Sequence, residues 1–74
     1  MITNSNAAKQ ISEVMWEILG KIQESLEGVK QTCPPEEYET FNRAVGEIVA
    51  PIMFKVLEPL YKENPTLKPA GWDS

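Results

Sequence analysis

Apolar residues between Ala7 and Lys30 recur at spacings of three and four residues, which places side chains along one face of an α-helix. They are Ile11, Val14, Met15, Ile18, Leu19, Ile22, Leu26 and Val29. Asn4, Ser5 and Asn6 precede them and can accept hydrogen bonds from the free N–H groups of a helix start. The pattern predicts an amphipathic helix over residues 5 to 30. Its apolar stripe spans roughly 140° of the surface, enough to contact more than one neighbour.

A second helical pattern begins directly after two prolines. Pro34 and Pro35 end the first helix, because proline cannot extend a helix, yet proline suits the first position of a new one. The acidic side chains of Glu36, Glu37 and Glu39 follow, and their charge favours the positive end of the helix dipole. We interpret them as features of a helix start rather than as a cation site.

The apolar residues of this second helix keep one phase through Pro51. They are Tyr38, Phe41, Val45, Ile48, Val49, Ile52 and Val56. Because the pattern does not restart at Pro51, we predict a kink held by packing, although an internal proline costs about 3 kcal/mol. Beyond it the apolar positions rotate around the helix, so the bend is expected to redirect the buried face. Pro59 and Pro65 limit further helix, which we expect to end near Lys62.

Residues 65–74 contain two prolines and a glycine and show no periodicity. This composition predicts an extended tail that follows a single helical domain of residues 1–64. The tail nevertheless contains Leu67 and Trp72, two large apolar residues that are not expected in a fully solvated segment. We therefore expect part of it to pack against its own chain, with binding of a partner as the alternative.

The chain has 74 residues, a length that limits the core it can form. From the dependence of surface area on chain mass, about 62% of the surface of the unfolded chain is buried on folding. A core this small contributes little free energy to stability. A helix of about 25 residues is about 38 Å long, whereas a compact globule of this length is about 30 Å across. Two such helices with a short connection form an antiparallel hairpin. Because each apolar stripe is wider than one neighbour can cover, we predict an all-α hairpin that dimerises into a four-helix bundle with twofold symmetry.

Eleven acidic and seven basic residues give a net charge of −4, which argues against nucleic acid or an anionic membrane as a partner. The first residues, Met1 to Asn6, have neither the basic nor the apolar region of a secretory signal. The longest apolar run, Ile48 to Phe54, is seven residues and contains a proline. A membrane span needs about 18. We expect a cytoplasmic protein.

The sequence has no histidine and one cysteine, Cys33. These absences exclude a histidine-based catalytic triad, a zinc site, an internal disulfide and the carboxylate–histidine di-metal pattern. The single aspartate, Asp73, cannot supply a calcium-binding loop. We expect no enzymatic activity and no cofactor. The carboxylates of the first helix are expected on its solvated face, with Glu17 and Lys21 as a surface ion pair.

Three large aromatic residues do not fit the core pattern. Trp16 lies opposite the apolar stripe, with the polar Ser12 as part of an expected rim, and Phe54 lies off the stripe of the second helix. Tryptophan is enriched where interfaces contribute most to binding. The candidate partner-binding residues are Trp16, Gly20, Phe54 and Trp72. The tail, a second subunit or a different protein could cover them.

Three classes of function remain. The first is a small acidic cytosolic protein-interaction or adaptor module without catalytic activity. The alternative is an acidic inhibitor, antitoxin-like or chaperone-like protein that masks a basic or apolar partner. The third is an enzyme or carrier with a ligand pocket between the helices, for which Tyr38, Tyr61 and Cys33 are the polar candidates. A helical hairpin is shared by many unrelated proteins and points to no particular family.

Overall fold

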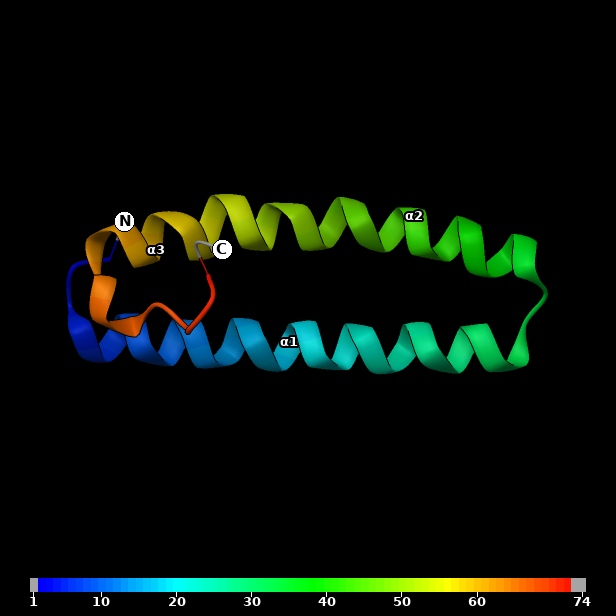
Figure 1. Ribbon diagram of the computed structural model, residues 1–74, viewed down its shortest axis with the longest axis horizontal. Helices are drawn as coiled ribbons and strands as arrows, with labels where there is room; N and C mark the ends of the chain where they lie inside the picture. The colour runs from blue at the N-terminus through cyan, green and yellow to red at the C-terminus, as the bar shows by residue number, and fades with distance from the viewer. Residues whose placement is uncertain (1, 73–74) are drawn as a thin grey trace.

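Two long helical arms lie antiparallel and side by side (Figure 1). The computed structural model describes residues 2–72, so that Met1, Asp73 and Ser74 lie outside it, and the described part contains no strand. The first arm is α1 (Ser5–Thr32). The second arm joins α2 (Pro35–Pro51), the π-helical segment η1 (Ile52–Leu57) and α3 (Glu58–Glu63), and the 3-10 turn η2 (Pro65–Leu67) follows. The predicted all-α helical hairpin is confirmed.

Local hydrogen bonds explain where α1 begins and ends. The Asn4 side chain accepts a bond of 3.0 Å from the Ala7 N–H and caps the helix. At the other end, the Thr32 hydroxyl donates to the Gly28 carbonyl at 2.7 Å. The helix continues past the predicted end at residue 30, because the Cys33 N–H still forms a helical backbone bond of 2.9 Å to the Val29 carbonyl. Pro34 then takes an extended conformation, which separates α1 from α2.

The second arm passes through Pro51 without a break. Pro51 itself has helical dihedral angles (φ −62°, ψ −35°), so the expectation that the helix does not end here is confirmed. The sequence pattern did not predict the π-helical segment that follows, in which the Glu58 N–H donates to the Met53 carbonyl five residues earlier. In a regular α-helix the Pro59 ring would collide with the carbonyl of Lys55. The wider π turn moves that carbonyl away.

The tightly packed core lies at the end of the hairpin that contains the start of α1 and α3 (Figure 1). Its buried members are Ala8, Leu57, Leu60 and Tyr61, and the partly buried residues around them are Ile2, Ile11, Met15, Leu19, Ile52, Met53, Leu67 and Trp72. No residue between positions 13 and 44 is buried. In the half of the hairpin near the loop that connects α1 and α2, the buried residue of the described chain is Val45. One end of the molecule is therefore a small globule, and the other is a thin pair of helices.

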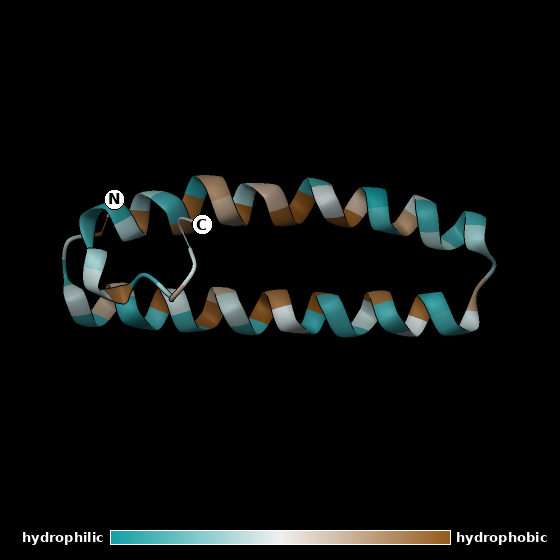
Figure 2. Cartoon of the chain, viewed as in Figure 1, coloured by the Kyte–Doolittle hydropathy of each residue, from teal (hydrophilic) through white to brown (hydrophobic). Residues whose placement is uncertain are grey.

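The hairpin is elongated, with principal dimensions of 44 × 21 × 16 Å. Its radius of gyration is 14.7 Å, against about 11 Å for a compact chain of this length. Its accessible surface is 5,380 Å², about 800 Å² more than the scaling for a compact protein of this mass gives. Figure 2 shows that apolar residues continue along both arms, beyond the packed end. No helix in the described range combines the length and apolar character needed to cross a membrane.

Candidate functional site

The residues after α3 fold back over the start of α1 (Figure 1). Asn64 is buried, and its amide donates to the Ile2 carbonyl at 2.6 Å and to the Leu60 carbonyl at 3.1 Å. Gly71 adopts a φ of 83°, which glycine accepts without steric cost and which turns the chain before Trp72. The tail is thus a series of turns rather than the predicted extended segment. Its predicted packing against its own chain is confirmed for Leu67 and Trp72.

Trp72 contacts two aromatic rings edge-on. Its ring centroid lies 5.0 Å from that of Tyr61 and 6.3 Å from that of Trp16, at interplanar angles of 81° and 84°. Such pairs contribute about 0.5 to 1.5 kcal/mol beyond the area they bury. Trp16 remains 42% exposed. The tail therefore covers part of Trp16 and leaves the rest accessible.

The Tyr61 hydroxyl connects Trp16 with Ser12. It lies 2.9 Å from the Trp16 indole nitrogen and 2.5 Å from the Ser12 hydroxyl. Because an indole N–H can only donate, the Tyr61 oxygen accepts from Trp16, whereas in the bond between Tyr61 and Ser12 either hydroxyl can be the donor. Ser12 is buried, so the prediction that it belongs to an exposed polar rim is wrong. One face of α1 contains Ala8, Ser12 and Trp16, which are spaced four residues apart. This spacing is the sequence signal that could have indicated that Ser12 is buried.

The other two candidate partner-binding residues are Phe54 and Gly20. Phe54 lies on η1 and is 68% exposed, and it lines a cavity together with Met53 and Trp72. Gly20 lies one turn beyond Trp16, and a Cβ atom there would meet no other atom within 4 Å. The structure thus brings Trp16, Trp72 and Phe54 to the packed end of the hairpin and leaves Gly20 uncovered.

The open surroundings of Gly20 predict that Gly20→Ala raises the free energy of unfolding by about 0.8 to 1 kcal/mol, the difference in helix propensity. Urea unfolding followed by circular dichroism measures the change. Gly71→Ala is the matched control, because its φ of 83° makes a Cβ unfavourable and the substitution should destabilise the chain. A loss of stability in Gly20→Ala would show instead that other backbone packs against this position.

A second apolar surface consists of Val14 and Ile18 on α1 and Ile48 on α2, which are 48%, 38% and 55% exposed. We call it the open apolar face. At about 100° per residue, all three are displaced in the same rotational direction from the buried residues of their helices, Ala8 and Val45. Because the two arms are antiparallel, the same direction of rotation means the same face of the hairpin. Trp16 and the docked tail lie on the opposite flank of α1.

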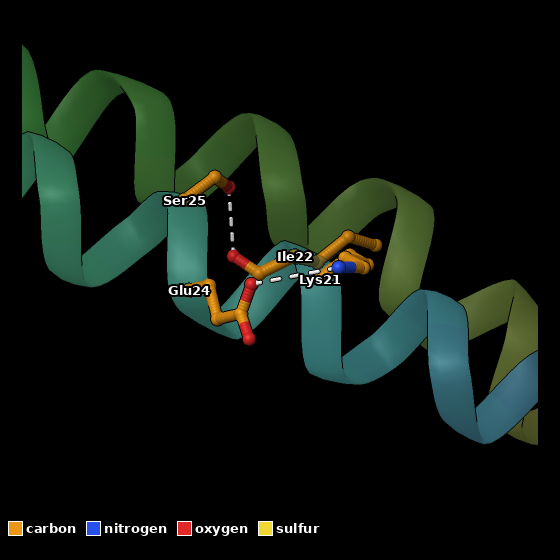
Figure 3. A network of polar contacts seen from close by, with 4 residues as sticks. All are labelled: Lys21, Ile22, Glu24 and Ser25. Carbon is orange, nitrogen blue, oxygen red and sulfur yellow. Dashed lines mark hydrogen bonds and ion pairs between the residues drawn. The ribbon is translucent and has the colours of Figure 1, made fainter.

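The charged side chains of α1 all lie at the surface. Lys21 pairs with Glu24 at 4.0 Å rather than with Glu17 as predicted, and the nearby Ser25 hydroxyl donates to the Ile22 carbonyl at 2.7 Å (Figure 3). Both members of the ion pair are largely exposed, so it contributes little to stability. Across residues 2–72, no group of three or more histidine, cysteine, aspartate or glutamate side chains could hold a metal.

The three polar residues considered for a ligand pocket do not meet. Cys33 and Tyr38 lie near the connection between the arms, whereas Tyr61 lies at the packed end (Figure 1). The Tyr61 hydroxyl is also engaged by Ser12 and Trp16. The arrangement therefore gives no pocket that joins Tyr38, Tyr61 and Cys33.

Comparison with known proteins gave no match: no family model fits the sequence, and no curated protein and no solved structure is significantly similar to the chain.

Proposed function

We propose that this chain is a small acidic protein-interaction module of the cytoplasm, without catalytic activity, that acts as a homodimer. Two hairpins pair through their open apolar faces and form a four-helix bundle. The observation that carries the proposal is the surplus of accessible surface, about 800 Å² relative to a compact protein. A standard protein–protein interface takes about 800 Å² from each partner.

The position of the open apolar face supports a second copy as the occupant. Val14, Ile18 and Ile48 lie on the thin part of the hairpin, where no residue between positions 13 and 44 is buried. A twofold axis places a patch of this kind against itself, so that one apolar surface serves both protomers. Packing of a second hairpin there would supply the core that the isolated arms lack.

In the proposed dimer the tail side of each hairpin faces outward. Trp16, Phe54 and Trp72 then remain available to a different protein, which is the adaptor role. The acidic inhibitor or chaperone-like alternative is favoured by the charge distribution, since residues 1–51 carry eight glutamates and four basic residues. A basic protein that binds at low salt and dissociates at high salt would support this alternative.

The concentration dependence of thermal unfolding tests the interface. Because only folded protomers associate, the melting temperature of the wild-type chain should rise with protein concentration. Ile18→Lys and Ile48→Lys place a charge in the open apolar face and should abolish this dependence. Phe54→Lys is the control, since it adds the same charge at a residue on η1 that lies outside that face. An equal loss in all three variants would contradict the assignment of the interface.

A further inference from the structure

A cavity of about 410 Å³ lies beside the docked tail. Its apolar lining consists of Met53 and Phe54 from η1, Tyr61 from α3 and Trp72 from the tail. This volume is in the range of small-molecule sites, about 300 to 1,000 Å³. A buried apolar cavity of about 150 Å³ holds a benzene molecule. The cavity beside the tail therefore has room for two fused aromatic rings.

Most of the apolar lining is aromatic. The Trp72 ring meets Tyr61 edge-on, and Phe54 is 68% exposed, more than the other exposed large hydrophobic side chains of the described chain. The Tyr61 hydroxyl is engaged by Ser12 and Trp16, so Tyr61 offers the cavity ring surface rather than a polar group. Aromatic rings contact one another favourably edge-on or offset-stacked. The lining therefore suits an aromatic ligand, which would also cover Phe54.

The backbone at the cavity is a second observation that points to a ligand. Met53 and Phe54 both lie on the π-helical segment η1. Such segments are rare, and they occur frequently at functional sites. The wall that presents Phe54 to the cavity thus coincides with an uncommon backbone element.

The charged residues at this end of the protein balance. Glu58 and Lys62, which both line the cavity, lie one turn apart on α3 and have opposite charges. Lys68 also lines it and already has an interaction partner. Residues 52–74 contain three lysines, two glutamates and one aspartate, a net charge of zero, whereas residues 1–51 have a net charge of −4. The site therefore selects neither an anion nor a cation, and an ionised ligand would lose hydration there without a compensating charge.

We propose that this cavity binds a neutral aromatic compound of about two rings. Its rings lie against Phe54, Trp72 and Tyr61, and the Met53 thioether makes a further favourable contact with them. The cavity lies on the tail side of the hairpin, so the proposal goes beyond the proposed homodimer and does not depend on it.

Four probes of similar size test the proposal on the full chain. Naphthalene-2-methanol is neutral, naphthalene-2-carboxylate is its anionic counterpart, naphthalen-2-ylmethylamine is its cationic counterpart, and decahydronaphthalene-2-methanol is neutral but has no aromatic ring. Binding is followed by amide and indole chemical shifts at physiological salt. The aromatic alcohol should bind about threefold or more tightly than either ion, because the cavity offers no compensating charge. It should also bind about threefold or more tightly than the saturated alcohol, which cannot make aromatic contacts.

The shifts and two variants locate the site. The shifts should centre on Phe54, Lys62 and Trp72, and Phe54→Ala should weaken binding of the aromatic alcohol about fivefold or more. Ile48→Ala is the matched control, because it truncates an exposed apolar side chain of the open apolar face that does not line the cavity, and it should leave the affinity unchanged. Both side chains are exposed, so the fold should persist, and circular dichroism verifies this.

Four results would overturn the proposal. They are tighter binding of either ion than of the aromatic alcohol, equal or tighter binding of the saturated alcohol, a loss of affinity in Ile48→Ala that matches that in Phe54→Ala, and no saturable binding of the aromatic alcohol at millimolar concentration.

Discussion

Leu60→Ala is expected to lower the free energy of unfolding by about 2 to 5 kcal/mol, because it removes a buried side chain and leaves a cavity. Leu60 is fully buried beside Ala8, Leu57 and Tyr61. A core of this size supplies only about 3 to 5 kcal/mol, so a large fraction of the variant should be unfolded at room temperature. Urea titration followed by circular dichroism measures the loss.

Leu26→Ala is the matched control for this substitution. Leu26 lies in the thin part of α1 and is only partly buried, so its truncation should cost less than that of Leu60. Equal losses in the two variants would contradict the conclusion that the packed core lies at the end of the hairpin that contains the start of α1 and α3.

Tyr61→Phe is expected to cost about 1 to 3 kcal/mol, because it leaves the buried Ser12 hydroxyl and the Trp16 indole N–H without their shared partner. Ser12→Ala in the same background should then cost less than Ser12→Ala alone. A double-mutant cycle from urea midpoints measures this coupling. Additive losses would show that the two hydroxyl groups do not interact. Tyr38→Phe, a change in a half-buried tyrosine of α2, is the control and should alter stability by no more than about 0.5 kcal/mol.

The helices and their antiparallel pairing could be predicted because they depend on local rules. The spacing of apolar residues indicates where each helical arm lies. Pro34 and Pro35 mark the connection between the two arms, because their effect on the backbone is local. The continuous phase of the apolar residues on both sides of Pro51 likewise indicated that the second arm does not end there. In each case the deciding interaction lies within a few residues along the chain.

The π-helical segment could not be predicted in this way. Widening one turn changes the register of every later residue, and so it decides how Leu57, Leu60 and Tyr61 face α1. The bond between Tyr61 and Ser12 joins residues 49 positions apart and depends on that register. A count at a fixed angle per residue therefore assigned Ser12 to an exposed rim, although it is buried.

The aromatic residues that depart from the apolar stripe were the informative signal for the candidate site. Trp72 contacts Trp16, and Trp72 and Phe54 line one cavity. The sequence could not show this grouping, because it depends on the turn at Gly71 and on the anchoring of Asn64 to Ile2. The role of Trp16, Gly20, Phe54 and Trp72 in binding a partner stays a prediction.

The mass of the folded protein in solution tests the central claim, that two hairpins form a dimer through their open apolar faces. Sedimentation equilibrium of the wild-type protein over a wide concentration range should give about 17 kDa, twice the chain mass of 8.3 kDa, with dissociation only on strong dilution. A folded species of 8.3 kDa at every concentration would contradict it.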